Sequence, residues 1–211
     1  MYSFSRPPID PPLILDADGQ VIDYGNRWDG SPPEDTYSVD THPERFAPLH
    51  AIADALIDYL ADAYDVEVTD GLEMASDLVH PHPAVVRAVR VRPLDEACAA
   101  LTFAFTDYPG LIVHAGALHD FPYPNCGCDA CDSTWDAEAS ALERQVAAVV
   151  TGGYREAITA GLHPWAEVAF TYPDGFSSGR SPAPDLPRDR LRAARAALRK
   201  RSKGWAPWAE R

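Results

Sequence analysis

The sequence predicts an α+β fold, in which an antiparallel sheet of about four strands is covered by two main helices. Strand-like runs follow one another directly with turn residues between them, which is typical of an antiparallel meander. Stretches with helical spacing lie before and after these runs instead of alternating with them, as a parallel sheet would require. The chain has 211 residues, of which 46% are hydrophobic, so it can bury a substantial single core.

Two stretches have the apolar spacing of amphipathic helices. The first follows Thr41-His42-Pro43-Glu44, a capping-box pattern with proline in the first turn, and extends to about Tyr64. The second begins near Ser133 and reaches Gly152-Gly153, where we expect an interruption or kink. We expect residues 154–160 to continue this second helix.

The strands are predicted from β-branched and aromatic runs bounded by turn residues, at 85–92, 99–106, 111–118 and 165–172. Pairing Asp107 with Gly110 in the second hairpin places His114 opposite Phe103, where we expect a hydrogen-bonded core histidine. The same pairing places Cys98 opposite His119, at the end of the hairpin that leads into the cysteines.

Cys126, Cys128 and Cys131 form a Cys-x-Cys-x2-Cys cluster just before the second helix. Thiolates are good zinc ligands, and this spacing lets one short turn present three sulfurs to one ion. A structural zinc takes a fourth ligand, for which we favour His119 because only seven residues separate it from Cys126. Cys98, Asp129, Asp132 and water remain alternatives, and His80 and His82 are weaker metal candidates.

The cluster leaves two classes of function open. The first is a non-enzymatic binding or adaptor protein with a structural zinc. The second is a small metal-dependent hydrolase, with an open coordination position and Glu138 as the base. We favour the first, because the sequence has no His-Glu-x2-His motif or phosphate loop. A thiol-disulfide function is disfavoured, because such sites usually follow a strand of a parallel βαβ unit.

Charge is unevenly distributed along this acidic chain, whose net charge is −14. Residues 186–211 contain nine Lys and Arg and two acidic residues, a net of +7, which leaves −21 on residues 1–185. We predict a basic C-terminal helix that docks on the acidic body, with Trp205 and Trp208 as anchors. Binding of nucleic acid through this tail is the alternative, and we expect it to be the weaker one.

The expected organisation is a Pro/Gly-rich arm with a small hairpin at 1–40, a core domain at 41–173, and a flexible linker followed by the basic helix at 174–211. The N-terminus lacks the apolar run of a signal peptide, and no stretch approaches the roughly 20 apolar residues of a membrane span. We therefore expect a cytoplasmic protein without a membrane partner.

Two segments also resemble a known family. THPERFAPLH at 41–50, together with CGCDACD at 126–132, resembles a family of uncharacterised bacterial proteins, common in actinobacteria and known as a domain of unknown function. The resemblance spans roughly residues 35–172. It implies a cytoplasmic bacterial protein and no particular activity.

Overall fold

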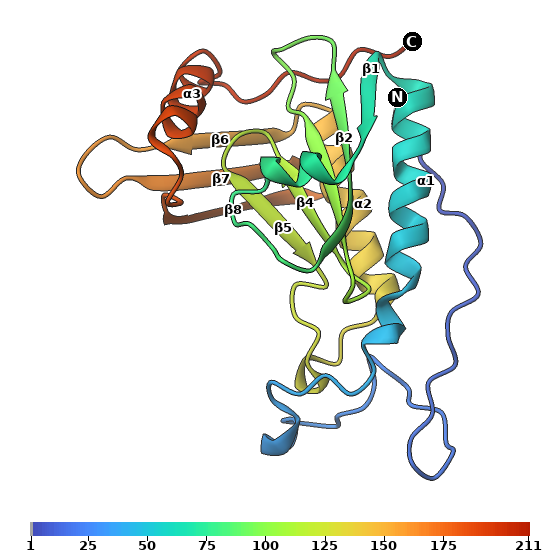
Figure 1. Ribbon diagram of the computed structural model, residues 1–211. Helices are drawn as coiled ribbons and strands as arrows, with labels where there is room; N and C mark the ends of the chain where they lie inside the picture. The colour runs from blue at the N-terminus through green and yellow to red at the C-terminus, as the bar shows by residue number, and fades with distance from the viewer. Residues whose placement is uncertain (1) are drawn as a thin grey trace.

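A computed structural model describes residues 2–211 and confirms the α+β fold (Figure 1). The α-helices are α1 (Pro48–Ala63), α2 (Trp135–Val150) and α3 (Arg188–Arg199). Short 3-10 helices are η1 (Glu34–Thr36), η2 (Pro43–Phe46), η3 (Leu72–Asp77) and η4 (Asp129–Cys131). The strands are β1 (Val66–Asp70), β2 (Val85–Pro93), β3 (Leu101–Thr106), β4 (Leu111–Ala115), β5 (His119–Tyr123), β6 (Tyr154–Ile158), β7 (Trp165–Tyr172) and β8 (Gly175–Pro182).

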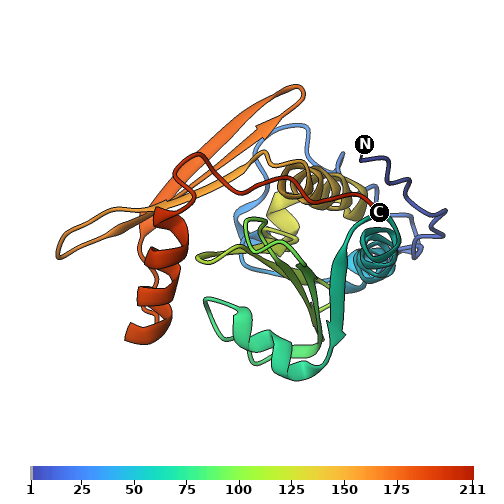
Figure 2. The ribbon, with the colours of Figure 1, turned by 90° about the horizontal axis from the view of Figure 1, so that it is seen from above.

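The larger sheet is an antiparallel meander in the order β1-β2-β3-β4-β5. Leu101, Phe103 and Phe105 alternate along β3 and belong to the core cluster, to which α1 and α2 contribute their buried faces. The η3 segment lies on the other side of the sheet from α1 (Figure 2). The order of β2, β3 and β4 was predicted, whereas β1 and β5 were not, and the strand predicted at 165–172 is β7 of a second sheet.

The second hairpin of the meander has a different register from the predicted one. Phe103 pairs with Val113, and His114 pairs with Thr102 and Asp120, so His114 lies on the face away from Phe103. The predicted strand 111–118 ends at Ala115, and the chain then turns through Gly116, which has a φ of 70°. His114 is buried and its Nδ1 lies 2.8 Å from an Asp120 carboxylate oxygen, as expected for a hydrogen-bonded core histidine.

A second, three-stranded sheet in the order β6-β7-β8 replaces two predicted features. Residues 154–158 form β6 instead of continuing the helix, because α2 ends before Gly152 and the burial of Tyr154 and Glu156 then alternates with the exposure of Arg155. Gly175–Pro182 is strand β8 and not a flexible linker. All eight residues of β8 are exposed, so no apolar pattern marks this edge strand in the sequence.

The C-terminal tail docks on the rest of the chain through indoles and backbone carbonyls. Trp208 Nε1 donates to the carbonyl of Ala99 at 3.0 Å, and Trp205 Nε1 donates to Glu156 at 3.0 Å. Arg190 donates to the carbonyls of Ser76, Asp77 and Leu78. Within residues 2–211, no ion pair joins α3 to a carboxylate. In the same residues, no helix combines the length and apolar character that crossing a membrane needs.

Candidate metal centre

The three clustered cysteines lie in the connection between the meander and α2. The chain leaves β5 at Tyr123, passes Cys126 and Cys128, and makes the single 3-10 turn η4, whose last residue is Cys131. Asp132 then adopts a left-handed conformation, with a φ of 51°, that ends the turn. We call residues 125–133 the knuckle. Because it is a short turn between two packed elements, its three thiols face one another.

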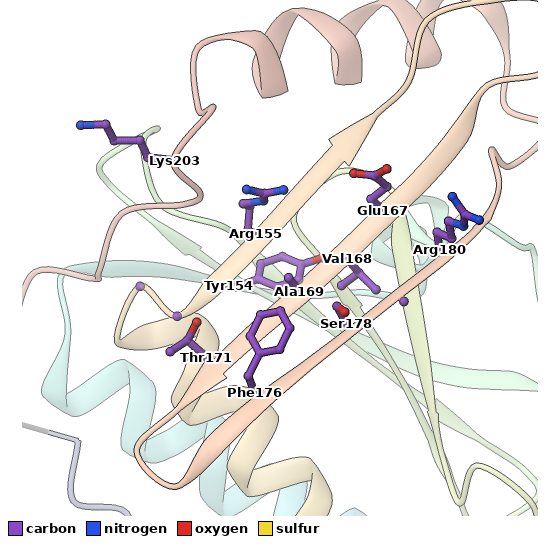
Figure 3. Close-up of a pocket in the computed structure, with 13 residues that line it drawn as sticks. Tyr154, Arg155, Glu167, Val168, Ala169, Thr171, Phe176, Ser178, Arg180 and Lys203 are labelled. Atoms are coloured by element: carbon purple, nitrogen blue, oxygen red, sulfur yellow. The ribbon is translucent and has the colours of Figure 1, made fainter.

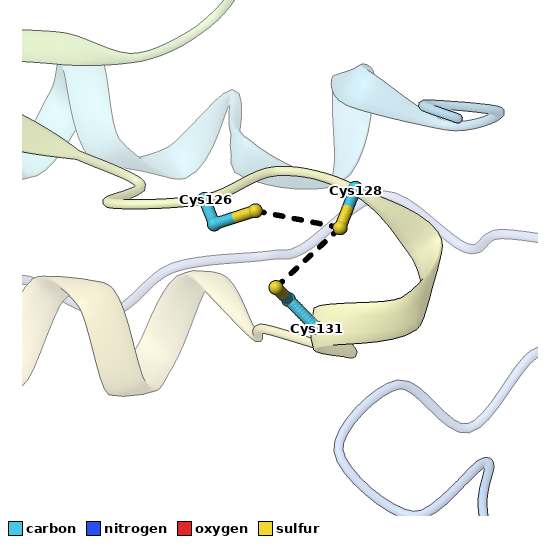
Figure 4. Close-up of side chains that lie close together, drawn as sticks. All are labelled: Cys126, Cys128 and Cys131. Carbon is cyan, nitrogen blue, oxygen red and sulfur yellow. Dashed lines mark hydrogen bonds between the residues drawn. The ribbon is translucent and has the colours of Figure 1, made fainter. Parts of the chain in front are cut away.

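The sulfur atoms are close enough to share one ion. The Sγ atoms of Cys126 and Cys128 lie 3.4 Å apart, as do those of Cys128 and Cys131 (Figure 4). All three lie within 4.8 Å of one another, and all four cysteines of the chain are free. A tetrahedral zinc with Zn–S bonds of about 2.3 Å separates its sulfurs by about 3.8 Å, so small shifts would complete such a site.

Hydrogen bonds make the three thiols unequal. Partial burial raises the pKa of Cys128, but hydrogen bonds from the Cys126 thiol and from the backbone N–H groups of Cys131 and Ser38 outweigh it and lower this pKa to about 7. Hydrogen bonds to Cys126 and Cys128 hold the proton on Cys131, whose pKa is raised to about 12. Cys128 therefore loses its proton more readily than Cys131, and a thiolate is the form that binds metal.

Arg45 holds the knuckle from inside the protein. Its side chain is 3% exposed, and its guanidinium donates to the carbonyls of Gly127 at 2.6 Å, His42 at 2.9 Å and Ser133 at 3.4 Å. The same guanidinium lies over the ring of Tyr24, 4.3 Å from its centroid. One side chain thus joins both ends of the knuckle to the start of η2.

Asp129 provides the second anchor of the knuckle. Its buried carboxylate accepts from Thr41 Oγ1 at 2.8 Å and lies 3.8 Å from both Arg27 and Arg45. Its backbone N–H donates to the carbonyl of Val39 at 2.7 Å. The predicted capping box therefore does not form: no side chain caps η2, and Thr41 binds Asp129 instead. The N-terminal arm packs on the knuckle through these contacts (Figure 1).

Gly127 is required by close packing. A Cβ at this position would lie 1.9 Å from the hydroxyl oxygen of Tyr108, which is far inside van der Waals contact. The Tyr108 hydroxyl is buried without a hydrogen-bond partner within residues 2–211. Burial, together with the nearby Asp40, raises the pKa of Tyr108 to about 12. Tyr108 therefore places a neutral polar group beside the thiols.

The structure does not bring His119 to the cysteines. His119 pairs with Ala115 at the start of β5, whereas the knuckle follows the other end of this strand. Its Nδ1 lies 2.7 Å from the buried Glu156 carboxylate, and it is not part of the cysteine group. The reason is the early end of the predicted strand 111–118: the chain turns at Gly116, and β5 then runs back along β4 before the knuckle begins.

The other candidate ligands have partners elsewhere, although within residues 2–211 the second carboxylate oxygen of Asp132 is buried without one. Cys98 is buried against the C-terminal tail, where its thiol donates to the carbonyl of Pro207 at 3.2 Å, and burial raises its pKa. Asp129 is held by Thr41, and one carboxylate oxygen of Asp132 accepts from the backbone of Arg27 at 2.9 Å. Within residues 2–211, the group that could hold a metal consists of three cysteines.

Two features beside the knuckle bear on chemistry. A groove of about 400 Å³ passes Cys126 and is also lined by His80, His82 and Tyr108. Glu138, in the first turn of α2, accepts a hydrogen bond from the backbone N–H of Asn125 at 3.3 Å. Burial raises the pKa of Glu138. The carboxylate proposed from the sequence as a base therefore reaches the residue that precedes Cys126.

Sequence reasoning missed Arg45 and Tyr108 as parts of this site. The contacts of Arg45 with the knuckle join segments more than 80 residues apart, and Tyr108 packs against the core. No local spacing in the sequence reveals either of them. One signal was present for Arg45. It lies in the THPERF segment that, together with the cysteine segment, carries the family resemblance, and the two segments are in contact in the structure.

Fold and site together define an α+β protein with a three-cysteine cluster that could hold a metal ion. The chain belongs to DUF6226, a family of unknown function, whose model matches residues 10–211. No curated protein and no solved structure matches the chain. The family match extends beyond the span of the resemblance in both directions and includes most of the arm, the second sheet and the tail.

Proposed function

We propose that the protein binds one zinc ion through Cys126, Cys128 and Cys131, and that this ion stabilises the knuckle of a non-enzymatic binding or adaptor protein. The observation that carries the proposal is the gathering of three sulfurs within 4.8 Å in a turn that other side chains already hold. Soft thiolate ligands favour zinc over magnesium or calcium. Three thiolates stay reduced in a reducing compartment, which agrees with the cytoplasmic location that we also propose.

The fourth zinc ligand in this proposal is a water molecule or a ligand atom that another molecule supplies. His119, Cys98 and Asp129 each have another partner, as described above. Cys131 is exposed, so the side of the cluster that it borders is open to solvent.

The structural role predicts that the metal contributes to folding stability. At free zinc about 1,000 times its dissociation constant, binding adds about 4 kcal/mol to the free energy of unfolding, which raises Tm by roughly 10 °C in a chain of this size. Removing zinc with a chelator, or replacing Cys128→Ser, should abolish this gain in calorimetry. Cys98→Ser is the matched control, because Cys98 lies outside the cluster and should leave the metal-dependent part of Tm unchanged. Equal melting curves with and without metal would disprove a structural zinc.

A second candidate, a metal-dependent hydrolase, is favoured by one observation. Glu138 lies beside the knuckle, and an open fourth position is the feature that distinguishes catalytic zinc sites from closed structural ones. X-ray absorption that finds four sulfurs around the zinc would exclude the hydrolase, whereas three sulfurs and one oxygen would fit both candidates, so a Glu138 variant has to decide between them. If the hydrolase is correct, Glu138→Gln should bind zinc normally and lose hydrolysis of p-nitrophenyl acetate.

A further inference from the structure

The second sheet has one packed face and one open face. Tyr154, Glu156 and Phe170 point into the core, and their neighbours in the strands point outward. The open face borders a hollow of about 640 Å³ (Figure 3). Its floor is made of small residues, because Ala169 pairs with Ser178 at the middle of β7 and β8. Planar groups can therefore approach the backbone here.

Basic side chains surround this face. Arg155 from β6 and Arg180 from β8 line the hollow together with Lys203, which follows α3. A second hollow of about 410 Å³, between β6 and α3, is lined by Arg155 again and by Arg195 and Arg199. We call these five residues and the face between them the cationic platform.

The charges of the cationic platform are not neutralised by the protein. Within residues 2–211, none of its five basic side chains forms an ion pair with a carboxylate. Two carboxylates line the hollows. Glu167 lies on the open face directly opposite Arg180 in the β7–β8 pairing, and although the two form no ion pair, Glu167 offsets part of the positive charge. Glu156 is buried, and it accepts from the backbone N–H groups of Ala117 and Leu118 and from the side chains of His119 and Trp205. The platform therefore presents a net positive charge to solvent.

The charge of this region is opposite to that of the rest of the chain. Residues 152–205 contain ten Lys and Arg and five acidic residues, a net of +5, which leaves −19 on the remainder. Figure 2 shows that α3 lies beside the β6-β7-β8 sheet, and the basic residues of the two therefore share one hollow. An anionic partner would be attracted to this surface and repelled by the body.

Aromatic rings are exposed on the same face. Phe176 is 66% exposed and lines the larger hollow, and Trp165 is 41% exposed at the start of β7. The guanidinium of Arg180 lies 5.3 Å from the centroid of the Trp165 ring. Exposed rings next to unpaired arginines are the two elements of sites that bind single-stranded nucleic acid, where bases stack on rings and phosphates contact the basic groups.

We propose that the cationic platform binds single-stranded nucleic acid, independently of the metal centre. A single strand fits better than a duplex, because only unpaired bases can stack on Phe176. This revises the expectation from the sequence, which assumed that the acidic body neutralises the arginines of the tail. The tail is held by its tryptophans and by carbonyl contacts, which leaves Arg195 and Arg199 available.

Fluorescence anisotropy with labelled eight-nucleotide oligouridylate, oligothymidylate and a duplex of the same length tests this proposal on the intact protein. We expect saturable binding of the single strands that weakens between 50 and 200 mM salt, and weaker binding of the duplex. Tighter binding of the RNA would identify contacts to the 2′-hydroxyl, and equal binding would assign recognition to phosphates and bases. Either result supports the platform.

Variants of the platform separate phosphate contacts from base stacking. Arg155→Ala with Arg180→Ala should weaken binding at least tenfold and reduce the salt slope by about 1.4, since each phosphate contact on a single strand contributes about 0.7. Phe176→Ala should weaken binding about tenfold with an unchanged slope, because stacking releases no counterions. Arg92→Ala is the matched basic control on the other sheet, and Leu162→Ala is the matched apolar control, since Leu162 is 95% exposed. Both controls should bind within twofold of the parent protein.

Three results would overturn the proposal. The first is no binding of any single strand at low salt. The second is binding that the platform variants leave unchanged. The third is salt-sensitive self-association in sedimentation that Arg155→Ala with Arg180→Ala abolishes, which would make the acidic body of a second copy the occupant.

Discussion

At the scale of single residues, Arg45 decides the geometry of the knuckle. It is a buried cation whose carbonyl partners come from η2 and from both ends of the knuckle. A planar guanidinium with five donors can make these contacts at once, whereas an ammonium group presents its donors from a single point. Asp129 depends on the same side chain, because Arg45 is one of two cations within 4.0 Å of its buried carboxylate.

Replacing Arg45→Lys should therefore lower the free energy of unfolding by about 2–3 kcal/mol, because two carbonyls lose their donor and Asp129 keeps only Arg27 close by. Urea denaturation measures this change. Arg92→Lys is the control: Arg92 is exposed and paired with Glu67, so its substitution should cost less than about 0.5 kcal/mol. Equal stability of the Arg45→Lys and Arg92→Lys variants would show that the hydrogen bonds of Arg45 do not contribute to the free energy of unfolding.

At the scale of elements, one carboxylate of η3 bonds to two strands of the sheet. Asp77, the last residue of η3, accepts from Arg90 of β2 and from Thr102 Oγ1 of β3 at 2.6 Å. Burial alone would raise the pKa of Asp77, but its hydrogen bonds to Arg90 and Thr102 lower it below its ordinary value. The carbonyl of Asp77 also accepts from Arg190, so the same turn supports α3.

The lowered pKa gives Asp77 a defined effect on the pH dependence of stability. Its contribution is present above the ordinary carboxyl pKa of about 3.9, and it is lost as the pH falls through the lower folded-state value. Asp77→Asn should cost about 1–2 kcal/mol at pH 7 and make the loss of stability below pH 4 less steep. Denaturation between pH 2 and 7 checks both effects. Asp62→Asn, on an exposed position of α1, is the control and should change neither the stability at pH 7 nor its loss below pH 4. If the stability of the Asp77 variant fell with pH as steeply as that of the parent protein, the proposed role of this carboxylate would be refuted.

At the scale of the whole molecule, the C-terminal tail closes the structure. Trp208 is buried against Tyr64 at the end of α1, and Trp205 reaches Glu156 of the second sheet. Glu156 also accepts from the backbone of Ala117 and Leu118 in the turn between β4 and β5. The tail thus connects the two sheets and α1 through buried groups, which salt screens much less than exposed charges.

Docking through buried indoles predicts a tail that is insensitive to salt. Limited proteolysis should cut residues 186–204 at the same rate in 50 and 500 mM salt. Trp208→Ala should expose the tail to the protease and cost about 3–5 kcal/mol, as large-to-small core substitutions do. Trp165→Ala is the matched control, because this tryptophan is 41% exposed whereas Trp208 is 4% exposed. Faster cleavage of the parent protein at high salt would show that charges hold the tail after all.

The sequence by itself determined the features that depend on local spacing. The helical stretches of α1 and α2, the order of the meander and the cysteine cluster follow from periods of 3.6 and 2 and from the reach of one short turn. Only the tertiary structure decided the hairpin register, in which a shift of one residue put His114 on the opposite face from Phe103. The turn at Gly116 into β5 was decided in the same way, and it placed His119 at the end of this strand away from the thiols. It also decided that β6 and β8 are strands, because the buried polar Glu156 and the wholly exposed β8 remove the apolar alternation that marks a strand. The partners of Arg45 and the unpaired arginines around the second sheet were likewise decided by packing, because they depend on contacts between segments far apart in the chain.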